Sequence, residues 1–128
     1  MPKILVADDE HNIVRIVTVC LEMEGFEVVS ATDGREALDK AMTELPDLII
    51  LDIMMPLLDG MEVLRQLGYH RDTRRIPVIM LTAKTGNFDV TQAREMGVKE
   101  YLTKPFDRDR LLAAVRKALR LPSKPASA

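Results

Sequence analysis

At 128 residues with 47% hydrophobic content, the chain is long enough to bury the core of one globular domain and too short for two. Its 18 Lys and Arg against 20 Asp and Glu give a formal net charge of -2, which argues against direct binding of a nucleic acid. A single cysteine, Cys20, excludes an internal disulfide, and no stretch reaches the roughly 18 consecutive apolar residues of a membrane span, so we expect a cytoplasmic protein without membrane contact.

Short apolar runs alternate with helical patterns along the chain. Apolar runs of about four to six residues between polar ones are typical of strands buried on both faces of a sheet. In chain order, strands are predicted at residues 3–7, 26–31, 47–52, 77–82 and 99–103. Each is followed by apolar residues at helical spacing. These patterns predict helices that end near Gly25, Pro46, Gly68, Gly97 and Leu121.

The second predicted helix has a clear start signal. Asp33 can cap its first turn, and Glu36 three residues later completes an Asx version of the capping box. The fourth helix is expected over about residues 88–96 and the last over about residues 107–121.

The order of these elements predicts the fold class. Five strand–helix units in series favour a doubly wound α/β fold, with a five-stranded parallel sheet, right-handed crossovers and helices on both faces. Residues 1–121 would form this one domain, and residues 122–128 a disordered tail or a truncated linker.

Polar side chains of complementary chemistry stand at the ends of four predicted strands. Asp8 and Asp9 follow the first strand, Asp52 ends the third, Thr82 ends the fourth and Lys104 follows the fifth. The carboxyl ends of parallel strands meet at one edge of a sheet, where ligands bind in open α/β folds. We therefore expect these side chains to lie close together.

Three carboxylates so placed suggest a metal and a phosphoryl group. Each pair at about 4 Å repels by roughly 4 kcal/mol at an effective dielectric constant near 20. Mg²⁺ relieves such repulsion and is commonly completed by a phosphate oxygen. Lys104 can pair with a phosphoryl oxygen, and Thr82 can donate a hydrogen bond to another. Asp52 is then the candidate nucleophile, because a carboxylate can attack phosphorus to give an aspartyl phosphate.

At these residues the chain resembles a known family, the receiver (CheY-like) domains of two-component response regulators. The matching motifs are ILVADDE, LIILDIMMPLLDG, VIMLTA and YLTKPF, within residues 3–120. The resemblance implies a flavodoxin-like (βα)5 fold with strand order 2-1-3-4-5, the order given for this family. It also implies that a sensor histidine kinase or a phosphotransfer protein supplies a phosphoryl group to Asp52.

The resemblance implies a role for each site residue. Asp9 and Asp52 would bind Mg²⁺, or Mn²⁺ in its place, through their side chains. Met54 would contribute its backbone carbonyl, and Asp8 would bind directly or through water. Lys104 would take part in catalysis, and the Lys104–Pro105 peptide bond would be cis.

Thr82 is expected to act both in catalysis and, with Tyr101, as a switch pair. In the family, the hydroxyl moves toward the phosphoryl group and the aromatic ring turns inward. The new charge would thereby change the face formed by the segments at 88–96, 99–103 and 107–121. That face would control a downstream effector protein or an output domain missing from this chain.

The chain is not expected to be an enzyme beyond catalysing its own phosphorylation and dephosphorylation. It is expected to be a monomer or a weak, phosphorylation-dependent dimer. The final-helix positions that pair across dimers in the DNA-binding subfamily hold Arg110 and Ala114 here, which makes that salt-bridge network doubtful.

Other protein classes with related chemistry fit less well. A haloacid dehalogenase-like phosphatase also uses an Asp nucleophile with Mg²⁺, but it has a second Asp two residues later where this chain has Met54. A flavin carrier would need a Ser-, Thr- or Gly-rich phosphate loop after the first strand, and DDEHN is acidic. A phosphorylation-independent interaction module with the same fold stays open as the alternative function.

Overall fold

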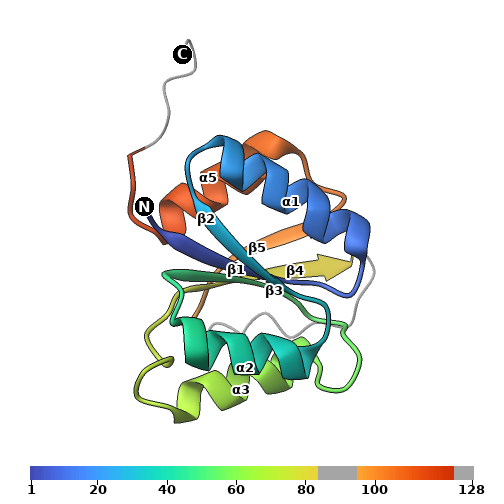
Figure 1. Cartoon of the computed structure of the whole chain (residues 1–128), viewed down its shortest axis with the longest axis vertical. Helices are drawn as coiled ribbons and strands as arrows, with labels where there is room; N and C mark the ends of the chain where they lie inside the picture. Colours follow the sequence, from blue (N-terminus) through green and yellow to red (C-terminus); the bar gives the residue numbers. More distant parts are fainter. Residues whose placement is uncertain (84–94, 123–128) are drawn as a thin grey trace.

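A five-stranded parallel sheet forms the middle layer of the protein, as the computed structural model shows for residues 1–83 and 95–122 (Figure 1). The order along the sheet is β2-β1-β3-β4-β5, which confirms the predicted fold class and strand order. The strands are β1 (Lys3–Ala7), β2 (Glu27–Ala31), β3 (Leu48–Asp52), β4 (Val78–Ala83) and β5 (Val98–Lys104).

Helices cover both faces of this sheet, as expected for a doubly wound fold. Helices α1 (His11–Met23) and α5 (Arg108–Ala118) lie on one face, while α2 (Gly34–Glu44) and α3 (Gly60–Tyr69) lie on the other (Figure 1). The helix expected over 88–96 falls mostly on residues 84–94, outside the described part of the chain. The expected tail falls outside it beyond residue 122. Among the described helices, none has the length and apolar character needed to cross a membrane.

Two apolar cores explain why the strand segments are apolar at consecutive positions. Alternate strand side chains such as Leu5 and Ile49 pack toward α2 and α3, and their neighbours Ile4 and Ile50 pack toward α1 and α5. All of β3 is buried, including Asp52 at its end. A strand with a helical layer on each side needs apolar side chains on both faces. An ionisable residue in such a strand is therefore unusual in its surroundings.

The register of the strands brings their carboxyl ends to one edge of the sheet. Ala7 of β1 pairs with Leu51 of β3, so Asp8 and Asp52 follow side by side. On the other side of β3, Asp52 pairs with Leu81, and the next residue of β4 is Thr82. Strand β5 ends at the same edge with Lys104.

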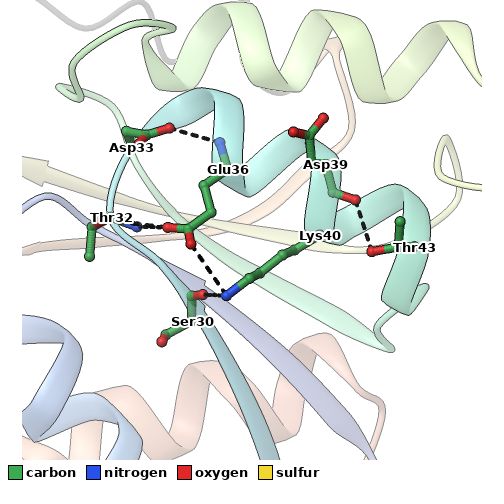
Figure 2. Close-up of polar contacts among 7 residues, drawn as sticks. All are labelled: Ser30, Thr32, Asp33, Glu36, Asp39, Lys40 and Thr43. Carbon is green, nitrogen blue, oxygen red and sulfur yellow. Dashed lines mark hydrogen bonds and ion pairs between the residues drawn. The ribbon is translucent and has the colours of Figure 1, made fainter.

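The start of α2 is fixed by a network of polar contacts at the end of β2 (Figure 2). Asp33 accepts a hydrogen bond from the Glu36 N–H at 2.7 Å, as predicted for the cap. The Glu36 carboxylate reaches the N–H of Thr32 at 2.8 Å instead of the N–H of the cap residue, so the expected capping box closes one residue earlier. Lys40 pairs with Glu36 at 3.4 Å and donates to the Ser30 carbonyl, which ties α2 to β2.

The loop between β3 and α3 packs closely against the starts of two helices. A Cβ at Gly60 would lie 2.2 Å from the Asp52 carbonyl oxygen, and one at Gly34 would lie 1.6 Å from the Leu58 carbonyl oxygen. The Gly60 N–H donates to the Ile53 carbonyl at 2.7 Å. Both positions require glycine, because the backbone of the β3–α3 loop or of Asp52 occupies the space that a Cβ atom would take. This packing fixes the backbone that follows Asp52.

Replacing Gly60 by alanine should destabilise the protein, because the backbone of Asp52 and Ile53 cannot move away without disturbing β3. We expect Gly60→Ala to lower the free energy of unfolding by about 1–3 kcal/mol. The matched control is Gly68→Ala in the same helix, where a Cβ meets nothing within 4 Å. That variant should gain up to about 1 kcal/mol from helix propensity. Urea unfolding measures both, and equal effects would contradict the close approach at Gly60.

Candidate functional site

The structure gathers four of the predicted site residues at the carboxyl edge of the sheet. Asp8 follows β1, Asp52 ends β3 and Lys104 ends β5. One carboxylate oxygen each from Asp8, Asp9 and Asp52 lies within 4.8 Å of the others. Asp8 is fully buried and Asp52 is 4% exposed, whereas Asp9 faces solvent. Asp9 is therefore the member of the cluster that is most accessible to solvent.

In the part of the chain that the structure describes, the Lys104 ammonium is the cation in contact with this cluster. Its Nζ lies 2.8 Å from Asp8 Oδ2 and 3.5 Å from Asp52 Oδ2. It also lies 3.2 Å from Glu10 Oε1, a contact that sequence reasoning missed. The only sequence signal for Glu10 is that it continues the acidic run after β1, which equally suits the start of a helix. Lys104 is thus shared among three carboxylates.

Backbone N–H groups hold the two buried carboxylates in place. The Glu10 N–H donates to Asp8 Oδ1 at 2.9 Å, and the Met54 N–H donates to Asp52 Oδ1 at 3.3 Å. Each contact joins a carboxylate to the loop that follows its own strand. The aspartates are therefore oriented by their local chain and not only by Lys104.

Asp8 Oδ2 is a buried oxygen that could bind a further cation. This buried oxygen touches Lys104 at 2.8 Å, but the angles are outside hydrogen-bond geometry and no other described group bonds to it. A buried carboxylate oxygen normally has a hydrogen bond or a metal. With Asp9 and Asp52 beside it, it belongs to an all-oxygen donor set that suits Mg²⁺, which keeps several water ligands on the open side. The residues present therefore fit a magnesium ion.

Met54 lies next to this donor set, two residues beyond Asp52. Its side chain is 72% exposed, and its N–H is directed to Asp52. The role of its backbone carbonyl as a metal ligand stays a prediction.

Electrostatics at Asp52 make its carboxyl unusually basic. Burial, followed by the charge of Asp8, raises the pKa of Asp52 to about 7, against the lowering effects of Lys104 and of the Met54 N–H. For Lys104, burial lowers the pKa, but the contacts with Asp8, Asp52 and Glu10 outweigh it, so its pKa is raised. Lys104 thus stays charged at neutral pH. A divalent cation at the cluster would favour the ionised form of Asp52, which is the form that can act as a nucleophile.

Thr82 and Tyr101 occupy neighbouring strands at the edge of the site. Thr82 pairs with Thr103, and Met80, two residues before Thr82, pairs with Tyr101. Side chains two residues apart on a strand share a face, so Thr82 and Tyr101 lie on the same face of the sheet. Both are partly buried, and Tyr101 packs against the core beneath α2 and α3. The aromatic ring is therefore close to the site in the sheet but outside the carboxylate cluster.

The raised pKa of Asp52 predicts how stability depends on pH in Mg²⁺-free buffer. Between its ordinary value of 3.8 and about 7, the folded state binds more protons than the unfolded state. The free energy of unfolding should therefore fall as the pH rises through this window and level off above it. Asp52→Asn removes the titrating group, so the variant should not lose this stability. The free energy of unfolding of the variant minus that of wild type should rise by about 1–3 kcal/mol between pH 4.5 and pH 8. Urea unfolding at both pH values tests this, and a constant difference would contradict the raised pKa.

Comparisons with known proteins agree on one family. A family model described as the response regulator receiver domain matches residues 4–116. The alkaline phosphatase synthesis transcriptional regulatory protein PhoP of Bacillus subtilis is 48% identical over 118 residues, which cover 92% of this chain and 48% of PhoP. The chain thus spans about half the length of this curated relative.

Solved structures extend the likeness to the fold. The receiver domain of a Francisella response regulator is 36% identical with a TM-score of 0.84, covering 94% of this chain and 98% of that one. The receiver domain of a sensor histidine kinase from Pseudomonas aeruginosa, with a magnesium ion coordinated in the active site cleft, is 28% identical with a TM-score of 0.84, covering 93% and 98%. On its family-model match and these relatives, the chain belongs to the response regulator receiver domains of two-component systems.

Proposed function

We propose that this domain is a phosphorelay switch that accepts a phosphoryl group on Asp52 with the help of Mg²⁺. The observation that carries the proposal is the contact set of Asp52: a buried carboxylate 3.5 Å from the Lys104 ammonium and clustered with Asp8 and Asp9. A buried carboxylate among other acids is costly for stability alone. The arrangement is useful if charge is brought to it during a reaction.

In the proposed reaction a carboxylate oxygen of Asp52 attacks phosphorus, and a new P–O bond forms. The bond from phosphorus to the donor breaks, and its electron pair leaves with the imidazole nitrogen of a phosphohistidine. Magnesium held by Asp8, Asp9 and Asp52 would supply positive charge against the phosphoryl oxygens. Lys104 would pair with a phosphoryl oxygen and Thr82 would donate a hydrogen bond to another. The ammonium is already in contact with Asp52, so little movement is needed.

The domain would catalyse only its own phosphorylation and dephosphorylation and would not turn over an external substrate. A phosphatase with an Asp nucleophile needs a second carboxylate as acid/base. Two residues beyond Asp52 the chain has Met54, whose side chain is exposed and not ionisable. The phosphoryl group would therefore stay on Asp52 for a time.

Phosphorylation would be transmitted through Thr82 and Tyr101. The two side chains share a face of the sheet, so a hydroxyl drawn toward the phosphoryl group leaves space on the side of the ring. Tyr101 also lines a surface hollow of about 340 Å³ between β5 and α5. We propose that partners detect the phosphorylated state at the β5–α5 face, where this hollow lies, together with the segment at 88–96.

The partners follow from the family and from the length of the chain. We propose a cognate histidine kinase or phosphotransfer protein as phosphodonor, in the cytoplasm. PhoP is named as a transcriptional regulatory protein, and this chain covers 48% of it. The output would accordingly lie in a further domain or a separate effector protein, and the receiver would be a monomer or a weak, phosphorylation-dependent dimer. At the β5–α5 face, Glu100 pairs with Lys117 of its own chain at 2.8 Å, which leaves both charges less available for pairing with a second copy.

Phosphodonor labelling tests the proposal directly. With Mg²⁺ and acetyl phosphate, the wild-type protein should gain one phosphoryl group, detected by intact-protein mass spectrometry. Asp52→Asn should abolish the gain, because the amide is not a nucleophile. Removing Mg²⁺ with a chelator should also abolish it.

The matched control is Asp59→Asn in the loop after Asp52. Asp59 caps α3 through the Glu62 N–H at 2.9 Å, and asparagine preserves that cap, so labelling should be unchanged. Labelling that persists in Asp52→Asn would rule out Asp52 as the acceptor. An unlabelled wild-type protein would favour the alternative, a phosphorylation-independent interaction module.

A further inference from the structure

Glu10 has a contact that the proposed reaction does not use. Its carboxylate lies 3.2 Å from Lys104 Nζ, although the two residues are 94 positions apart in the sequence. The Glu10 side chain is 61% exposed, in contrast to the buried Asp8 that shares the same ammonium. Glu10 can therefore exchange this contact for water at low cost, which Asp8 cannot do.

The backbone of Glu10 is held in place, and within residues 1–83 and 95–122 its carboxylate contacts Lys104. Its N–H donates to Asp8 Oδ1 at 2.9 Å, which holds its backbone beside the pocket. Glu10 is also the N-cap of α1, yet its side chain makes no capping hydrogen bond. The carboxylate is thus directed to Lys104 in place of the usual partner at this position.

This contact places Glu10 in competition with an incoming phosphoryl group. A phosphoryl oxygen and the Glu10 carboxylate would both pair with Lys104, and a dianionic donor also meets the negative charge of Glu10 as it approaches. We propose that Glu10 is a positioning residue that holds Lys104 in the resting protein and lowers the affinity of the site for strongly anionic phosphodonors. The inference rests on the proposed phosphorylation of Asp52. It makes the charge of Glu10 one of the factors that decide which phosphodonors the site accepts.

The size of the effect follows from the exposure of Glu10. Exposed ion pairs contribute at most about 1 kcal/mol, which corresponds to a change in binding of up to about five-fold. Removing the charge should lower the half-saturating concentration of an anionic donor by about two- to five-fold. The maximal rate should change less than about two-fold, because Lys104 and Asp52 are unaltered. The difference should shrink at high ionic strength.

The experiment compares Glu10→Gln with wild type using two small phosphodonors. Acetyl phosphate releases acetate when its phosphoryl group is transferred to Asp52, and phosphoramidate releases ammonia. Near neutral pH, acetyl phosphate carries more negative charge than phosphoramidate. The half-saturating concentration should fall for acetyl phosphate and change less for phosphoramidate. Glu22→Gln is the matched control, because Glu22 is exposed on the same helix, about 18 Å further along its axis.

Either of two labelling results would overturn the inference. The half-saturating concentration could shift equally for both donors, or Glu10→Gln could give the same values as Glu22→Gln. Absence of Asp52-dependent labelling in wild type would instead refute the proposed function. The hold on Lys104 is then tested without any donor, by NMR of the Lys104 Cε and Nζ signals in the resting protein. These signals should shift in Glu10→Gln and not in Glu22→Gln, and unchanged signals would overturn the inference on their own.

Discussion

The contact between the Lys104 ammonium and the buried carboxylates of Asp8 and Asp52 is the interaction on which the rest of the site depends. These groups come from β5, β1 and β3, so the contact exists only when the sheet has its observed order and all three strands end at one edge. Losing one partner of a buried ion pair typically costs about 3–5 kcal/mol. The buried charges are therefore tolerated as a set, which requires the three strands to lie in this order. Within residues 1–83 and 95–122, the negative charge of the cluster exceeds the single charge of Lys104, which would favour binding of a further cation.

A stiff backbone around Asp52 makes this charge arrangement tolerable. Strand β3 is buried along its whole length, and the loop after it is held by close packing at Gly60 and Gly34. Asp52 is 4% exposed, and this burial is the largest cause of its raised pKa. In the proposed function, positive charge brought to this carboxyl would make it a nucleophile. In that case the buried carboxylates would lower the stability of the domain but provide the reactive group. The two apolar cores stabilise the domain as a whole.

Sequence patterns predicted the fold well because strands and caps have local signatures. The apolar run at Ile49 and the cap at Asp33 depend on neighbours a few residues away, and both were confirmed. The site residues could be predicted to lie close together because the carboxyl ends of parallel strands lie at the same edge of the sheet. The contact of Glu10 with Lys104 could not be predicted, since it joins residues far apart in sequence and depends on side-chain reach. The close approach at Gly60 was missed for another reason, because a glycine after a loop is equally typical of an ordinary turn.

A crystal structure with Mg²⁺ and beryllofluoride would show whether Asp52 is the acceptor and whether the carboxylate cluster holds the metal. We expect beryllium bonded to an oxygen of Asp52, Mg²⁺ bound by the Asp8, Asp9 and Asp52 cluster, and a fluorine paired with Lys104. Thr82 should approach a second fluorine, and the Tyr101 ring should turn inward. Beryllofluoride on another residue, or Mg²⁺ bound away from this cluster, would contradict the account.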